Sequence, residues 1–380
     1  MPQKPFNPIL ALVGVSLLAL LAAGVWLGNH RPTPPATPTG PTSAVASTPT
    51  EPAANPALTD KLKATAKQLA TATDAAGRNA ALAAIKAALS SGSPHEASGA
   101  IRQFLDSKTD ATTGLGFKVG KGGSLKEAPT LRTWLLDELG QIDPAAAAAY
   151  AKVILNSSDS PDEWAVALRN LALGDTSAEA RSLLEQKTAA LLGNQSWQQN
   201  PSTGYLEAFD VAVYLGGSQL TPALANLVQQ QSNPAVAHAS FLALDRLVIN
   251  NPAATLSTLL SEPTSMQGRE STRADYFARA DVRDPQQRQI LENYLLNPQI
   301  SPTELNAFAG IYPNANYMIS DNLLTQNQTP DRAALTGRDT ASLQALQQWL
   351  ADPRFAQIRP NLQSAANRLA EFVQQENAQK

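Results

Sequence analysis

The chain has 380 residues, of which 29 are basic and 32 acidic, so only 16% are charged, against about 25% in typical soluble domains. It has no Cys and three His, which excludes a disulfide framework, a thiolate zinc site, an iron–sulfur cluster and a Cys nucleophile. The net charge of −3 gives no reason to expect a nucleic-acid partner. We expect no metal and no small-molecule cofactor.

The N-terminal region, residues 1–30, predicts a membrane anchor. Residues 9–27 carry no charge, and as a helix they would be about 28 Å long, close to the hydrocarbon core of a bilayer. Lys4 precedes the run and Trp26 stands near its far end, as interfacial aromatics do. Ala22-Ala23-Gly24 would suit a cleaved signal peptide, which is the alternative. Either interpretation places the remainder outside the cytoplasm, in the periplasm or the external space.

Residues 31–57 predict a disordered linker. The segment is rich in Pro, Thr and Ala, and it shows no apolar period that could bury a core. Proline restricts φ and removes backbone donors, which favours extended polyproline II structure. We expect a spacer between the membrane and a folded domain.

Residues 58–380 predict an all-α domain of short helices. Apolar residues recur three and four positions apart, as in 62–69, 131–135 and 164–171, and no series of alternating strands is present. The predicted helix starts carry a capping residue followed by Pro, as in Ser160-Pro161 and Asn233-Pro234. Many short helices joined by short loops favour helix pairs stacked in series.

Residues 220–262 show this pattern best, with a polar turn at Asn233-Pro234 between two apolar helices. Residues 159–192 repeat it around Gly174-Asp175. Over about 130–262 the sequence resembles HEAT and armadillo repeats. The resemblance implies a right-handed α-solenoid that binds proteins, and it supplies no catalytic residues.

Two segments interrupt the helical pattern, at about 107–127 and 312–336. The first is rich in Gly and predicts a loop with a small hairpin around 117–119. The second is rich in Asn and predicts a long irregular stretch. Exposed loops often carry binding residues, so these segments supply the candidate interaction residues, which are Tyr312, Asn314, Asn316, Tyr317 and Phe117.

Catalytic chemistry has little support in the residues. The Gly-rich loop lacks the spacing and the preceding strand of a phosphate-binding loop. Paired carboxylates remain, chiefly Asp137-Glu138 and Asp162-Glu163, but the latter suit the first turn of a helix. The Arg residues between 269 and 288 alternate with acids and predict a solvated helix face with local ion pairs.

The sequence therefore predicts a membrane-anchored, extracytoplasmic helical-repeat scaffold that binds a protein partner in the cell envelope. It assigns no catalytic, cofactor-binding or metal-binding residue, and a non-enzymatic role is favoured. The alternative is an envelope glycan hydrolase of helical-toroid type that uses two carboxylates.

Overall fold

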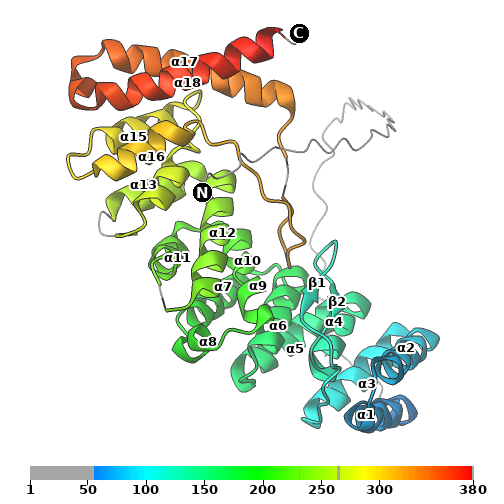
Figure 1. Ribbon diagram of the computed structural model, residues 1–380. Coiled ribbons are helices and arrows are strands. Elements are labelled where there is room, and N and C mark those ends of the chain that lie inside the picture. The colour runs from blue at the N-terminus through cyan, green and yellow to red at the C-terminus, as the bar shows by residue number, and fades with distance from the viewer. Residues whose placement is uncertain (1–54, 231, 263–265, 328, 379–380) are drawn as a thin grey trace, which may run out of the picture. The chain divides into compact units, whose positions relative to one another are not determined.

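The computed structural model describes residues 55–230, 232–262, 266–327 and 329–378, and these are mostly helical, as predicted (Figure 1). The first helix begins at Pro56, close to the expected domain start at 58. The predicted anchor, 1–30, and almost all of the linker lie outside the described residues. Within the described part, no helix combines the length and apolar character needed to cross a membrane.

The N-terminal half contains helices whose first turns are closed by side chains. Asn55, Ser93, Asp143 and Ser160 each accept a hydrogen bond from a backbone N–H of the helix that follows, and Pro occupies its first turn. The elements are α1 (Pro56–Thr71), α2 (Ala75–Ser91), α3 (Pro94–Asp106), β1 (Lys118–Val119), β2 (Leu125–Glu127), α4 (Leu131–Ile142), α5 (Pro144–Ser157), α6 (Pro161–Gly174) and α7 (Ala178–Leu192).

The C-terminal half begins with short helices and ends with two long ones. Its elements are α8 (Gln195–Gln199), α9 (Thr203–Glu207), α10 (Asp210–Leu215), η1 (Ser218–Leu220), α11 (Thr221–Val228), α12 (Pro234–Asn250), α13 (Pro252–Ser261), α14 (Glu270–Phe277), α15 (Pro285–Leu295), α16 (Pro302–Ile311), α17 (Arg332–Ala351), η2 (Pro353–Ile358) and α18 (Arg359–Ala378).

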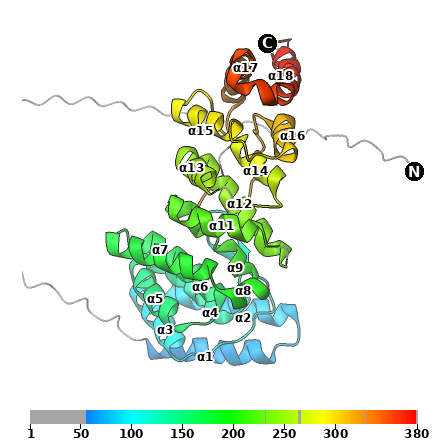
Figure 2. The ribbon, with the colours of Figure 1, turned by 90° about the vertical axis from the view of Figure 1, so that its left-hand side faces the viewer.

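Helices pack in pairs and on the helix after next. α5 packs on α6, α11 on α12 and α17 on α18, and Figures 1 and 2 both show the last two of these helices side by side. In addition, α4 contacts α6, and α16 contacts both α14 and α18. Helices such as α6 and α16 thereby bury apolar surface on two sets of neighbours, which is the contact pattern of paired helices.

Five mostly buried ion pairs reinforce the contacts between alternate helices. Each joins side chains 31 to 36 positions apart, one from or just after each of two alternate helices. Because both partners leave water together, each pair satisfies charges that would otherwise be costly to bury. The pairs are Arg132–Glu163, Arg169–Asp137, Arg246–Asp210, Arg273–Glu304 and Arg279–Asp245.

Aromatic side chains form part of the core in the last third of the chain. The rings of Phe277 and Tyr294 are stacked with centroids 3.9 Å apart, and those of Phe308 and Tyr312 at 4.8 Å. Trp349 of α17 continues the contacts, at 6.4 Å from the ring of Tyr312. Tyr312 is therefore a fully buried core residue.

The Gly-rich stretch forms the expected hairpin, in which β1 and β2 pair antiparallel. Asp137 of α4 holds it, accepting a hydrogen bond from the backbone N–H of Leu125 at 3.0 Å. Arg169 of α6 pairs with that carboxylate and donates to the carbonyl of Gly123 at 2.7 Å. The glycines thus serve a structural turn that is fixed to two helices.

Residues 313–327 and 329–331, here called the connecting segment, lie between α16 and α17 and form no helix or strand beyond an isolated bridge between Asp321 and Gln326. In Figure 1 the segment extends from α16 toward the β1–β2 hairpin and returns to α17. Lys126 of the hairpin pairs with Asp321 at 3.2 Å. The irregular stretch was predicted at about 312–336, and the prediction is wrong over 332–336, where Asp331 caps α17 and the helix has already begun.

The contact between Gly123 and the connecting segment gives a test of this arrangement. Gly123 has φ +85°, and a Cβ there would lie 2.1 Å from the carbonyl oxygen of Leu323. We expect Gly123→Ala to lower the free energy of unfolding by about 1–3 kcal/mol more than Gly122→Ala. Gly122 also has a positive φ, +82°, but has nothing within 4 Å.

Denaturant unfolding and limited proteolysis of the two variants provide the measurement. The close approach should make the connecting segment more sensitive to protease in Gly123→Ala alone. Equal behaviour of both variants would mean that the hairpin does not support the segment.

Candidate binding cavity

A cavity of about 710 Å³ lies between α9, α12 and the connecting segment. Leu206 and Glu207 line it from α9, and Leu242 and Ile249 line it from α12. Met318 is among the residues of the connecting segment that complete the wall. Its size is within the range of sites that bind drug-sized ligands or short peptide segments.

Helix α12 supplies most of the helical wall, from the side opposite to its buried face. One face, with Val236, Leu244 and Leu247, is buried in the core. The opposite face places Ala235, Ala239, Leu242 and Ile249 at helical spacing toward the cavity. Polar residues of the same helix also line the cavity, so this side of α12 is mixed; they are His238, Asp245, Arg246 and Asn250.

A buried carboxylate fixes the far wall. Asp210, 1% exposed at the start of α10, accepts hydrogen bonds from the backbone N–H groups of Leu324 and Thr325 at 2.7 and 2.9 Å. Its other oxygen accepts from the Thr325 hydroxyl and from Arg246 of α12, the latter at 2.7 Å. One side chain thus joins α10, α12 and the connecting segment.

Three carboxylates line the cavity, and they differ in their partners: Asp321 pairs with Lys126 of the hairpin, and Asp245 and Glu207 differ as follows. Asp245 forms a bidentate ion pair with Arg279, in which Nε donates to Oδ1 and Nη2 donates to Oδ2, the latter at 2.9 Å. Burial raises the pKa of Asp245, and Arg279 opposes this. Burial also raises the pKa of Glu207, the charge of Asp210 adds to this, and the charge of Arg246 opposes it. Glu207 is half-buried and has no hydrogen-bond partner among the described residues.

The structure separates the five candidate interaction residues into two groups. Phe117, Tyr312 and Asn314 are buried, so they are not accessible to a partner on the described surface. Tyr317 lines the cavity, and Asn316 is exposed next to it in the chain. A partner contact at Asn316 or Tyr317 stays a prediction that needs no rearrangement of the core.

The Asn residues of the connecting segment bond mainly within the fold. Asn314 donates to the carbonyl of Asp275 at 3.2 Å, Asn322 to that of Thr325 at 3.1 Å, and Asn327 to that of Met318 at 2.6 Å. A segment without regular structure needs such side chains, because its backbone groups lack ladder partners.

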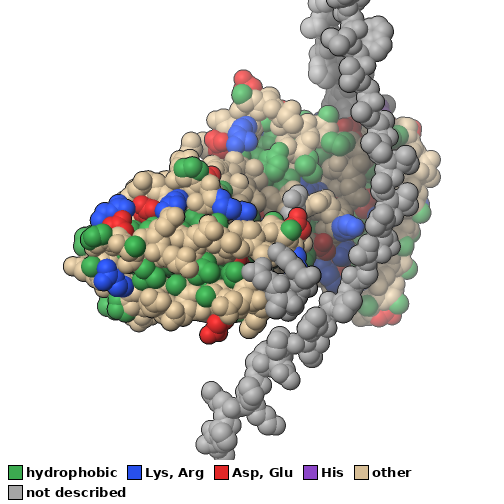
Figure 3. All heavy atoms as spheres, turned by 90° about the horizontal axis from the view of Figure 1, so that it is seen from above, with side chains coloured by type: hydrophobic (Ala, Val, Ile, Leu, Met, Phe, Trp, Pro, Cys, Tyr) green, Lys and Arg blue, Asp and Glu red, His purple; other side chains and the backbone are tan. Residues whose placement is uncertain are grey.

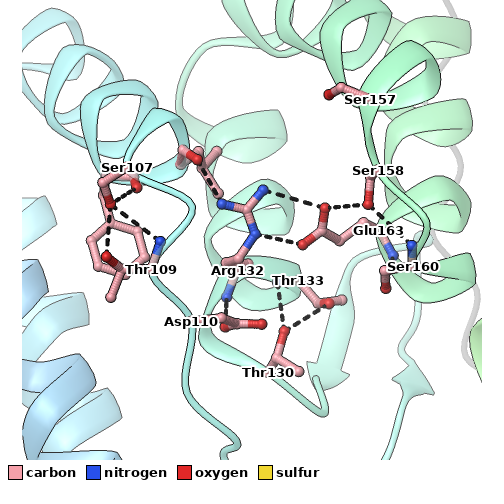
Figure 4. A network of polar contacts seen from close by, with 12 residues as sticks. Ser107, Thr109, Asp110, Thr130, Arg132, Thr133, Ser157, Ser158, Ser160 and Glu163 are labelled. Atoms are coloured by element: carbon pink, nitrogen blue, oxygen red, sulfur yellow. Dashed lines mark hydrogen bonds and ion pairs between the residues drawn. The ribbon is translucent and has the colours of Figure 1, made fainter.

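The carboxylates that the sequence offered for catalysis have structural partners. Glu163 binds Arg132 through Nε at 2.6 Å and accepts from Ser158 at 2.8 Å, and Figure 4 shows the two charged groups pointing toward each other from α6 and α4. Asp162 accepts from Ser202 at 2.6 Å. Asp137 pairs with Arg169, and Glu138 with Lys86 at 3.1 Å.

The prediction of a solvated Arg face across 269–288 is wrong for two of its members. Arg273 and the Arg279 side chain are buried, and their carboxylates come from other helices, Glu304 and Asp245. Arg283, which pairs with Asp281 at 2.6 Å, has the expected local partner. The carboxylates that bind Arg273 and Arg279 stand 31 and 34 positions away in the sequence. The local alternation of charges could therefore not predict these two pairs.

Three further observations concern metal ligands, the distribution of surface charge and similarity to known proteins. Among the described residues, no group of three His, Cys, Asp or Glu side chains is placed to hold a metal ion. On the face drawn in Figure 3, basic and acidic side chains lie interspersed. Comparison of the chain with protein-family models, curated proteins and solved structures finds no match in any of the three.

Sequence reasoning missed Glu207 and the apolar residues that α12 presents to the cavity. The signal for these apolar residues was present, since Ala235, Ala239, Leu242 and Ile249 follow helical spacing on the side opposite to Val236. Nothing near Glu207 in the sequence distinguishes it, because its surroundings come from α12 and the connecting segment.

Replacement of Asp210 tests the carboxylate that fixes the cavity wall. We expect Asp210→Asn to lower the free energy of unfolding by about 2–4 kcal/mol, because Arg246 loses its buried counter-charge and an amide NH₂ faces backbone donors. Asp321→Asn, which removes an exposed pair with Lys126, should cost below about 1 kcal/mol. Denaturant midpoints measure both.

Hydrogen exchange localises the effect of Asp210→Asn. The amides of Leu324 and Thr325 should exchange faster in this variant than in Asp321→Asn. Unchanged exchange at both amides would contradict the role given to Asp210.

The second test concerns the half-buried carboxylate of Glu207. Its pKa is raised in the folded state, so the ionised form opposes folding above that pKa. We therefore expect Glu207→Gln to raise the melting temperature at neutral pH. The difference in melting temperature should shrink as the pH falls through the raised pKa of the folded state. It should vanish below the ordinary pKa of the unfolded state, because Glu207 is then protonated in both states.

Melting curves from neutral to acid pH provide the measurement, with Glu185→Gln on α7 as the control. Glu185 makes an exposed pair with Arg181 at 3.4 Å, so its replacement should change little. A lower melting temperature for Glu207→Gln at neutral pH would show that Glu207 is a structural ion-pair member.

Proposed function

We propose that the chain is a membrane-anchored, extracytoplasmic scaffold whose helix pairs form a right-handed α-solenoid and bind a protein partner in the cell envelope. The observation that carries the proposal is the cavity between α12 and the connecting segment. It combines an apolar helix face, side-chain amides and a carboxylate without a hydrogen-bond partner among the described residues. A cavity lined by apolar side chains with a few polar groups is typical of ligand-binding sites.

The repeat part of the proposal is supported by the pairing of the helices. Contacts between alternate helices recur along the chain, and the buried ion pairs keep a separation of 31 to 36 residues. Repeat proteins bury a continuous core by stacking units of about this length. The HEAT and armadillo resemblance points the same way.

The location rests on the sequence. The uncharged run 9–27 and the Pro-rich residues 31–57 are the basis for an anchor followed by a spacer. With this arrangement the helical domain reaches a partner at some distance from the membrane surface. A secreted form after signal cleavage is the alternative.

The glycan-hydrolase alternative has less support. Asp137, Glu138, Asp162 and Glu163, which it would use, each bind a basic or hydroxyl-bearing side chain. Asp245, beside Glu207 in the cavity, is committed to Arg279. A retaining or inverting hydrolase needs two carboxyl groups available to the scissile bond.

Site-specific photocrosslinking in cells tests the proposal. A photoreactive amino acid at Met318, which lines the cavity and is 54% exposed, should form a discrete protein adduct. The same group at Phe372 of α18, which is 50% exposed, should not. Leu242→Glu, which places a charge on the cavity face of α12, should reduce the Met318 adduct at least about tenfold.

Circular dichroism of the purified Leu242→Glu variant establishes that it is folded. Absence of any Met318 adduct, or equal adducts at Met318 and Phe372, would contradict partner binding at this cavity.

A further inference from the structure

We propose that the occupant of the cavity is an extended peptide segment of the partner that carries a lysine or arginine side chain, with its cationic group bound at Glu207. This inference rests on the proposed function and adds the chemistry of the partner. It comes from the charges, the amides and the apolar surface that line one continuous space.

One carboxylate of the cavity wall forms no direct ion pair among the described residues. Asp245 is paired with Arg279, and Asp321 with Lys126. Arg246 directs its guanidinium to Asp210 at 2.7 Å and to the hydroxyl of Thr325 at 3.1 Å. Glu207 has no ion pair or hydrogen bond among the described residues, although the charge of Arg246 acts on it. His238 is the other titratable side chain that lines the cavity.

A half-buried carboxylate in this state is stabilised by an incoming cation. Burial raises the free energy of the ionised form, and the pKa of Glu207 is raised accordingly. A lysine or arginine that displaces the remaining water forms a charge-assisted hydrogen bond, stronger than one between neutral groups. An anionic ligand would meet repulsion at the same position, so charge complementarity selects a basic group.

The rest of the wall selects a peptide over a small amine. The amides of Asn250 and Gln326 line the cavity, are exposed and make no hydrogen bond among the described residues. A side-chain amide both donates and accepts, as a peptide group requires. Leu242, Ile249 and Met318 offer apolar surface to the aliphatic stem and to its neighbours.

The volume supports the same choice. About 710 Å³ is the space of a drug-sized ligand, larger than one basic side chain occupies. Several residues of an extended chain would fill it. A small polyamine would satisfy Glu207 but would leave the α12 face and the amides unoccupied.

Peptide mixtures test the inference without knowledge of the partner sequence. The probes are blocked pentapeptides with lysine, norleucine or glutamate fixed at the centre and the other positions randomised. They are applied to the immobilised full-length protein. We expect retention of the lysine mixture to exceed that of the norleucine mixture roughly 10- to 100-fold, the gain of a charged hydrogen bond. The glutamate mixture should be retained least.

Glu207→Gln is the decisive variant, and Glu185→Gln is its matched control. The first should abolish the preference for lysine while leaving retention of the norleucine mixture unchanged. The second should preserve the preference, since Glu185 lies on α7 in a pair with Arg181. Melting curves establish that both variants are folded.

Three results would overturn the inference. These are equal retention of the lysine and norleucine mixtures, no retention of any mixture, and displacement of the lysine mixture by an equal concentration of spermidine, which would indicate a site for small amines. If Met318 still forms its adduct in any of these cases, the scaffold function stands and only the peptide chemistry fails. If no adduct forms when the photoreactive group at Met318 is the only change in the protein, the scaffold function itself is contradicted.

Discussion

The candidate site depends on one buried carboxylate. Asp210 accepts hydrogen bonds from two backbone amides, a hydroxyl and a guanidinium, which come from the connecting segment and α12. A carboxylate has enough acceptor positions to satisfy all four donors, and a neutral amide has not. Because the connecting segment has no helical partner for its backbone, this bonding keeps it opposite α12. The cavity wall therefore follows from a residue that does not itself line the cavity.

Buried charge is used in the same way elsewhere in the helices. The chain is poor in charged residues, yet five Arg–carboxylate pairs lie between alternate helices. A buried pair adds little net stability over apolar packing, but breaking one is costly. Such pairs therefore favour one alignment of a helix with the helix after next. In a protein whose helices are short and rich in Ala and Leu, this restricts alternative packings that apolar contacts alone would allow.

The sequence was informative where structure is local. Helix starts followed from caps such as Ser160 and Asn233, helix faces from apolar spacing, and the hairpin from its glycines. It was uninformative where residues far apart meet. Asp210 and Leu324 are separated by 114 positions, and no local signal announces their contact. The Asn content of the connecting segment was correctly taken as a sign of irregular backbone, but most of those amides bond within the fold.

Glu207 is best understood against the pattern of the buried pairs. In each pair the Arg stands 31 to 36 positions from its carboxylate. At those separations from Glu207, residues 171–176 and 238–243 contain no Arg or Lys. His238 is the one residue in these ranges that can carry a positive charge, and Arg246, whose charge acts on Glu207, forms its ion pair with Asp210. A half-buried acid left in this state lowers stability, and such costs are typically retained where a residue contacts a ligand. A basic peptide bound as proposed would pair with the Glu207 carboxylate and cover the apolar residues that α12 presents to the cavity.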